Sequence, residues 1–333
     1  MKKFKFLLIP KSNNFREIIN INEISYQLKN LGHNCLTLKS QIGDDNLIFI
    51  LEEEKFDFVF RVNQGKPKNI NKKVRFISWV RQISDINDSL VNFNDNDLIY
   101  TLKKTHNNHK LKICQLLPAA NNFNNIPKVE DYELVTDKLE SFQKIDISIL
   151  SNYSRVDLFN GNKGLIANSN KIDSDKHKKL HKLLNNVDEK YKILIFSLIN
   201  YSNLLINKNI HYQGEINNFN YFFEIFKKSR FNLLFEDEFL DFNSNFFNIL
   251  LVQGILLANK KINKSFQNSI NNNFNFSDLV FFFNTELEIS SIINKYYAES
   301  KLRLRIGKEA SKFVLEYHTY KNRVEQILKD IKE

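Results

Sequence analysis

FKFLLIPKSNNFREIININEISYQLKNLGHNCLTL, residues 4–38, begins with an apolar run, continues as an amphipathic segment and returns to a second apolar run. The run at 4–9 ends at Pro10 and is typical of a buried strand. Apolar residues then recur at the spacing of one helical face, at Ile18, Ile21, Ile24, Leu28 and Leu31. Gly32 is a typical helix stop, and 35–38 is the next expected strand. A strand, a helix and a strand in this order predict a parallel sheet.

The rest of the first half repeats this alternation. We expect a short helix at 47–54 and further strands at 56–61, 74–79, 98–100 and 112–116. Such an order is typical of a Rossmann-like domain, and ligands of these domains bind outside the carboxyl ends of the strands.

A second α/β unit begins near residue 146 (DISILS, 146–151). We expect strands at 212–214, 231–235 and 255–258, and helices at 174–184, 221–228 and 246–253. The apolar segment 192–199 fits a strand or a helix equally well. The tail is helical, because apolar residues share one face from Leu302 to Tyr317 and again from Val324 to Ile331. The predicted domains are 1–140 and 141–318, followed by a terminal helix at 319–333.

The composition is that of a folded globular protein. Of the 333 residues, 42% are hydrophobic, and only 8 are Gly and 4 are Pro, which excludes collagen-like and linker-rich classes. Cys35 and Cys114 lie in apolar surroundings, where we expect buried thiols rather than ligands. No apolar stretch reaches the roughly 18 residues of a membrane span. We therefore expect a cytoplasmic protein.

The net charge is +10, with lysines dispersed along the chain. This charge fits a solvated surface, an anionic membrane surface or a phosphorylated ligand. No arginine-aromatic stripe or nucleic-acid motif accompanies the lysines, so a nucleic-acid partner is not expected.

Two acidic segments have residue types that can hold a metal ion. Asp95-Asn96-Asp97 has the D-x-D form that holds a metal on a nucleotide diphosphate, but it precedes its strand, so we expect a solvated loop. Glu236-Asp237-Glu238 follows a strand, and a solvated loop is again the favoured interpretation. Lys11 and the residues after it lead into a helix start, which fits either an anion site or plain helix capping.

Several segments together resemble a known family. They are 211–218 (HYQGEINN), 221–230, 245–258 (NFFNILLVQGILLA), 318–320 (HTY) and 74–79 (VRFISW). This set resembles GT-B glycosyltransferases, in particular the spore-maturation-protein-like "glycosyl transferases group 1" family. The resemblance implies two Rossmann-like domains that face a cleft, with a C-terminal helix that crosses back to the first domain. It makes 1–140 the acceptor side and 141–318 the donor-binding side.

The resemblance also implies the site residues. On the donor and nucleotide side they are Tyr153, Arg155, Gly214, Glu215, Asn245, Asn248 and Gly254; on the acceptor side they are Lys11, Asn13 and Trp79. Gly214 would allow close backbone approach to the donor. The helix that starts at Asn245 would aim its N-terminus at the diphosphate. Gly254 would let this helix turn tightly into the next strand.

The chain departs from the family at three places. Asn248 stands where the family usually has an acidic residue at the donor ribose, and Asn245 stands where it often has a basic residue. The Trp-x-Gln-Asp motif is altered after Trp79, and Asp85 is the nearest carboxylate. Asp85 is therefore the candidate general base of an inverting reaction, whereas a retaining reaction needs no such base.

These features predict a hexosyltransferase-type enzyme that uses a nucleotide sugar and requires no metal or other cofactor. The expected acceptor is a glycan, a lipid-linked molecule or a protein, in the synthesis of surface polysaccharide or glycoconjugate. Weak attachment to the anionic inner face of the membrane would suit a lipid-linked acceptor. The alternatives are a non-catalytic GT-B-like binding protein, which Asn248 and Gln82 favour, and a nucleic-acid-binding protein, which only the charge favours.

Overall fold

The computed structural model divides the chain into two compact units. Unit 1 comprises Met1–Asn124, Leu240–Asn243 and Tyr317–Glu333, and unit 2 comprises Asn125–Phe239 and Ser244–Glu316. The structure describes residues 2–11, 15–70, 73–102, 111–117, 119–120, 145–150, 182, 184–196, 209–214, 219–234, 245–259 and 276–332. Unit 1 is thus built from chain segments at both ends of the sequence.

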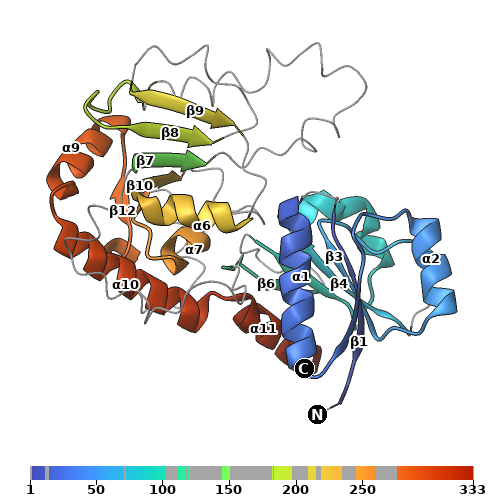
Figure 1. Ribbon diagram of the computed structural model, residues 1–333. Helices are drawn as coiled ribbons and strands as arrows, with labels where there is room; N and C mark the ends of the chain where they lie inside the picture. Colours follow the sequence, from blue (N-terminus) through green and yellow to red (C-terminus); the bar gives the residue numbers. More distant parts are fainter. Residues whose placement is uncertain are drawn as a thin grey trace, which may run out of the picture. The chain divides into compact units, whose positions relative to one another are not determined.

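Unit 1 contains a parallel sheet of six strands in the order β2-β1-β3-β4-β5-β6 (Figure 1). Its elements are β1 (Lys5–Ile9), α1 (Phe15–Asn30), β2 (Asn34–Thr37), α2 (Asp44–Glu53), β3 (Phe58–Val62), β4 (Arg75–Val80), the 3-10 segment η1 (Ile83–Asn92), β5 (Leu98–Thr101), β6 (Lys112–Gln115) and α11 (Tyr320–Lys332). The strands alternate in side-chain direction, so each face of the sheet carries its own apolar cluster. One cluster receives residues of α1 and α11, and the other receives residues of α2 and η1.

The terminal helix α11 completes the first of these clusters. Its buried apolar residues are Tyr320, Val324, Ile327, Leu328 and Ile331. Polar contacts hold both of its ends: Arg323 Nε donates to the Leu117 carbonyl (2.8 Å), and Arg75 Nη1 donates to the Ile331 carbonyl (3.0 Å). Lys112 Nζ donates to the Asp330 carbonyl (2.8 Å), which places a second cation at the negative end of the helix dipole.

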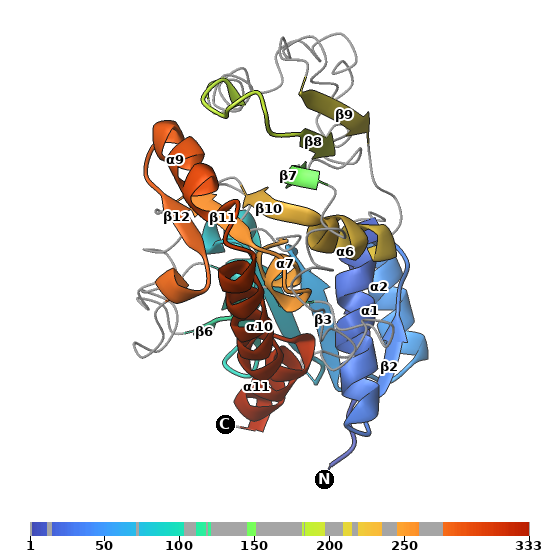
Figure 2. The same ribbon diagram turned by 60° about the vertical axis from the view of Figure 1, so that its left-hand side comes forward.

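Unit 2 contains a second parallel sheet, in the order β12-β11-β10-β7-β8-β9 (Figure 2). Its elements are β7 (Ile145–Leu150), β8 (Ile193–Phe196), β9 (Ile210–Gly214), α6 (Phe219–Lys228), β10 (Ser229–Leu234), α7 (Phe246–Leu251), β11 (Leu256–Asn259), the 3-10 turn η6 (Phe276–Asp278), β12 (Phe281–Phe283), α9 (Glu286–Tyr296) and α10 (Ser300–Tyr317). One face of this sheet packs against α9 and Ile306 of α10. The α6 helix packs on β7 and β10, and α7 packs on β11.

Candidate functional site

Each sheet reverses its strand order once. In unit 1 the reversal lies between β1 and β3, and in unit 2 it lies between β7 and β10. Ligands of open parallel sheets bind outside the carboxyl ends of the strands at such a reversal. The two candidate regions are therefore the ends of β1 and β3 in unit 1 and the ends of β7 and β10 in unit 2.

The carboxyl end of β3 carries a buried charge that sequence reasoning missed. Arg61, only 4% exposed, donates from Nε to Gln64 Oε1 (2.7 Å) and from Nη1 to the Gly65 carbonyl (2.7 Å). Its third nitrogen pairs with Asp44, the first residue of α2, at 3.4 Å. Burial lowers the pKa of the guanidinium. Arg61 thus ties the loop after β3 to the start of α2 beside the reversal. An Arg at the end of the apolar run FDFVFR was the available signal.

The predicted acceptor-side and catalytic residues occupy different environments in unit 1. Lys11 lies two residues after the end of β1, at the reversal, and is half-buried. Asp85 is exposed in the first turn of η1, which follows the carboxyl end of β4. Trp79, in contrast, is 1% exposed within the core, and its indole N–H donates to the Leu116 carbonyl (2.9 Å). A side chain enclosed in this way packs the core, so the expected contact of the Trp79 indole with an acceptor does not fit its position.

In unit 2, the helix after β10 brings the two predicted asparagines together. Asn245 stands at the N-cap of α7, and Asn248 lies in its first turn. Their exposures are 5% and 6%, and every residue of α7 is buried. Buried amides are held by hydrogen bonds, so both side chains have restricted orientations. The role of both residues in donor binding stays a prediction.

The end of α7 differs from the expected tight turn at Gly254. The left-handed residue is Gln253 (φ 64°), and its N–H bonds the Leu250 carbonyl while the Gly254 N–H bonds the Ile249 carbonyl. This pair of bonds is a Schellman motif. Gly254 is required for a different reason: a Cβ there would lie 2.9 Å from the Ile249 carbonyl oxygen and 3.0 Å from Asn232 Nδ2. Close packing, and not a left-handed backbone, explains this glycine.

Asn232 forms a buried polar centre on the strands of the reversal. Its Oδ1 accepts a hydrogen bond from Ser148 Oγ (2.7 Å), which joins β10 to β7. Its Nδ2 donates to the Phe226 carbonyl (3.1 Å) and to the Ile255 carbonyl (3.2 Å). One amide therefore links two central strands, the last part of α6 and the residue before β11. Nothing in the local sequence pattern predicts this role.

Helix α10 holds the other side of the α7–β11 turn. Ser311 Oγ donates to the Leu251 carbonyl (2.6 Å). Gly307 lies so close to the turn that a Cβ would be 2.5 Å from the Gln253 carbonyl oxygen. The turn is thereby fixed from the sheet by Asn232 and from α10 by these two small residues.

Some of the predicted site lies outside the described residues: Tyr153, Arg155, Glu215 and Asn13. Gly214 is the last residue of β9, and it pairs with Phe196 just after a bulge in the ladder between β8 and β9. It ends an edge strand of the unit 2 sheet.

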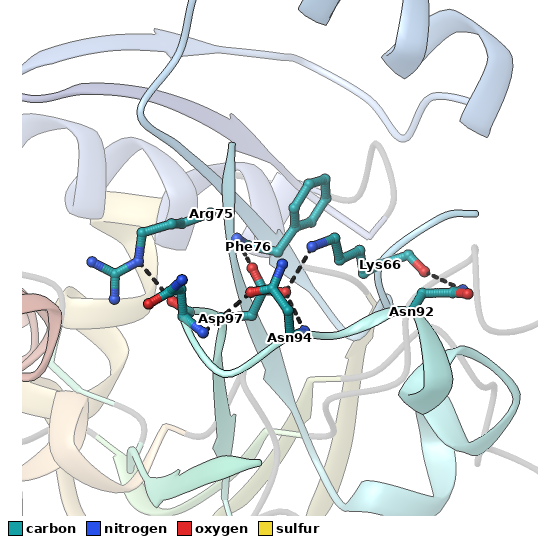
Figure 3. A network of polar contacts seen from close by, with 7 residues as sticks. Lys66, Arg75, Phe76, Asn92, Asn94 and Asp97 are labelled. Atoms are coloured by element: carbon teal, nitrogen blue, oxygen red, sulfur yellow. Dashed lines mark hydrogen bonds and ion pairs between the residues drawn. The ribbon is translucent and has the colours of Figure 1, made fainter. Parts of the chain in front are cut away.

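The expectation of a solvated D-x-D loop was wrong for Asp97. Asp97 is 2% exposed, and its Oδ2 accepts from Lys66 Nζ (2.7 Å) and from the Asn94 N–H (2.8 Å), while its Oδ1 accepts from the Phe76 N–H (2.7 Å) (Figure 3). The carbonyl of Lys66 accepts from Asn92 Nδ2 (2.8 Å). This ion pair lies at the amino end of β5, away from the carboxyl edge, and stabilises unit 1.

Two other kinds of site are absent from the described parts of the chain. In these parts, no group of three or more His, Cys, Asp or Glu side chains is placed to hold a metal ion. Among the same residues, no helix has both the length and the apolar character that a membrane crossing requires.

Comparison with known proteins shows which family part of the chain resembles. The sequence model of a family described as glycosyl transferase-like matches residues 176–329. No curated protein shows a significant sequence match.

Solved structures match the whole chain. A glycosyltransferase from Rickettsia africae ESF-5 is 13% identical with a TM-score of 0.63, and the match covers 100% of this chain and 98% of the other. HepE of Anabaena, solved with UDP and glucose, is 10% identical with a TM-score of 0.56, covering 99% of each chain. An alpha-glucosyltransferase solved with UDP-glucose and DNA containing an abasic site is 8% identical with a TM-score of 0.64, covering all of both chains. The predicted two-domain GT-B fold is confirmed.

Proposed function

We propose that this protein, which has the GT-B fold and matches a glycosyl transferase-like family over residues 176–329, transfers a hexose from a nucleotide sugar to an acceptor. The family match is the observation that carries the proposal. It spans β8 to β12 and α6 to α10, and so includes the carboxyl end of β10 and the α7 helix with Asn245 and Asn248.

The donor is proposed to be a uridine diphosphate sugar. This choice is supported by two solved structures of the same fold, one with UDP and glucose and one with UDP-glucose. The fixed turn at Gly254 supports a donor site at α7, because a preorganised site loses little free energy in ordering when the ligand binds. The diphosphate requires positive charge, for which Arg155 and Lys11 remain the candidates.

The donor test is a screen of uridine, guanosine, cytidine and thymidine diphosphates for thermal stabilisation. A nucleotide at 100 times its dissociation constant stabilises the fold by roughly 2.7 kcal/mol. We expect UDP to give the largest shift. A donor site is excluded if none of the four raises the melting temperature. Release of UDP from UDP-sugars then measures turnover. We propose that turnover requires no metal ion.

The acceptor is proposed to be a glycan, a lipid-linked molecule or a protein used in surface polysaccharide or glycoconjugate synthesis. A net charge of +10 supports weak binding to the anionic inner face of the membrane, where a lipid-linked acceptor would be found. Sedimentation with anionic liposomes tests this at low and physiological salt. Salt-sensitive binding is expected; equal binding to neutral liposomes, or none at low salt, contradicts it.

A second candidate function is a non-catalytic binding protein of the same fold. It is favoured by the buried amides Asn245 and Asn248, at positions where the resemblance implies a basic and an acidic side chain. Asn248→Asp restores the acidic residue with almost the same shape. If the acidic side chain can make the donor contact that the resemblance implies, this change is expected to increase UDP affinity. Asn87→Asp, at an exposed site on η1, is the matched control. UDP binding without turnover of any UDP-sugar identifies the binding protein.

A further inference from the structure

The contact between α1 and α11 in unit 1 contains two polar side chains in an otherwise apolar interface. Glu23 on α1 and Tyr320 on α11 are each 1% exposed. They lie among the apolar residues that the two helices give to the same cluster, including Ile24 and Val324. Within the described part of the chain, no group hydrogen-bonds Glu23 Oε2 or the Tyr320 hydroxyl. A charged carboxylate is costly in such a place, whereas a neutral carboxyl costs far less.

Burial accordingly raises the pKa of Glu23 to about 7, although a hydrogen bond with Gln27 one turn along α1 partly opposes the shift. The charge of Glu23 in turn acts on Tyr320, where burial and this carboxylate raise the pKa of the hydroxyl. An electrostatic interaction therefore couples an acid on one helix to a phenol on the other.

The positively charged side chain of Arg323 has hydrogen-bond partners other than Glu23. Arg323, one turn after Tyr320, donates to the Leu117 carbonyl (2.8 Å) and contacts His318 Nδ1 (2.8 Å). Its own pKa is lowered to about 10 by burial, and the pKa of His318 is lowered by burial and by Arg323. His318 is thus neutral near pH 7. Among the described residues, Glu23 interacts with Gln27 on its own helix and with Tyr320 on α11, and Arg323 also acts on Tyr320.

The position of this pair matters because the chain re-enters unit 1 there. Unit 1 resumes at Tyr317, and Thr319 forms a bridge to Ala120 immediately before α11 begins. Tyr320 is the first residue of α11. A change at Glu23 therefore acts on the first turn of the helix that closes the unit 1 core.

We infer that Glu23 is a proton-dependent lock between α1 and the first turn of α11, closed when its carboxyl is neutral and loosened when it is ionised. When the Glu23 carboxyl is neutral, the interface contains no buried carboxylate charge. The carboxyl then also carries a proton that it can donate within the interface. The ionised acid is stabilised by water, which reaches it only when the first turn of α11 opens. This inference does not depend on glycosyl transfer.

Amide hydrogen exchange of residues 319–326 in the full chain tests the lock. The raised pKa makes the closed state most favourable at low pH, and this advantage is lost as the pH rises through about 7. After correction for intrinsic exchange, the opening equilibrium constant is expected to increase about tenfold between pH 6 and pH 8, if the open state has an ordinary carboxyl pKa. Glu23→Gln, which cannot ionise, should abolish this increase.

Glu52→Gln is the matched control, because Glu52 is exposed on α2, and it should retain the wild-type pH dependence. The lock is refuted if protection of residues 319–326 is the same at both pH values in the wild type, or if Glu23→Gln still shows the increase. Carbon-detected titration of the Glu23 carboxyl in the wild type is an independent measurement. A midpoint below about pH 5.5 also refutes the lock, since an acid near its ordinary pKa is already ionised at pH 6.

Discussion

The hydroxyl of Ser311 on α10 donates a 2.6 Å hydrogen bond to the carbonyl oxygen of Leu251, the last residue of α7. The terminal carbonyls of a helix lack partners within the helix, so this bond satisfies one of them in a buried place. It also connects the long helix near the end of unit 2 to the short helix that carries Asn245 and Asn248. The candidate donor region therefore depends on residues that lie some 60 positions away in the sequence.

Ser311→Ala is expected to lower the free energy of unfolding by about 1–3 kcal/mol, because the buried Leu251 carbonyl loses its donor. The measurement is urea denaturation followed by fluorescence. Ser84→Ala, at an exposed site on η1, is the control and should change stability by less than about 0.5 kcal/mol. Equal effects of the two changes would show that the bond contributes nothing.

Gly307→Ala tests the close approach of α10 to the α7–β11 turn. The added Cβ would be 2.5 Å from the Gln253 carbonyl oxygen, so backbone must move, and a loss of about 1–3 kcal/mol is expected. Gly43→Ala has no atom within 4 Å of the new Cβ and should cost less than about 1 kcal/mol. If the donor site includes α7, Gly307→Ala should also weaken UDP binding measured by calorimetry, whereas Gly43→Ala should not.

Lys66→Met is expected to destabilise unit 1 strongly. It leaves Asp97 charged and buried with only backbone donors, and breaking a buried pair in this way costs about 3–5 kcal/mol. Lys68→Met, two residues along and exposed, is the control. The double change Lys66→Met with Asp97→Asn should recover part of the loss, since the remaining amide carries no charge. A single variant as stable as the wild type would contradict the assigned role of the pair.

The raised pKa of Glu23 also predicts how the free energy of unfolding of the whole protein depends on pH. Its pKa is raised from 4.5 to about 7 in the folded protein, so its contribution is fully present below pH 4.5 and is lost as the pH rises to about 7. Glu23→Gln should therefore stabilise the protein relative to the wild type more at pH 8 than at pH 5, by up to roughly 3 kcal/mol. Chemical denaturation at both pH values measures this, and an equal effect at both would contradict it.

The regular elements of the fold were largely predictable from apolar patterns. The run at 4–9, the helical face from Ile18 to Leu31 and the strands of unit 1 all appear within a few residues of their expected bounds. The ambiguous segment 192–199 contains the strand β8, and its alternatives could not be separated because a short apolar run suits both structures. Strand β12 and helix α9 were missed, although β12 lies within the apolar run at 279–283.

The candidate site was less predictable, because its support comes from contacts distant in sequence. The roles of Asn232, Ser311 and Arg61 depend on partners in other elements, and no local pattern specifies such partners. Asp97 was misjudged for the same reason: its place before the strand suggested a solvated loop, whereas Lys66, 31 residues earlier, neutralises it. Trp79 was expected at the acceptor on resemblance, but the tryptophan fills the core.

The discontinuity of unit 1 has a consequence for synthesis of the protein. The first 124 residues form its sheet, but α11, at Tyr320–Lys332, supplies five of the apolar side chains that pack on one face of that sheet beside α1. Domains generally fold in order as the chain emerges from the ribosome. Here the unit whose sheet is translated first keeps part of one apolar face uncovered until α11 has been released, while unit 2 has all its residues earlier. The nascent first half is therefore the part of the chain that most needs protection by chaperones.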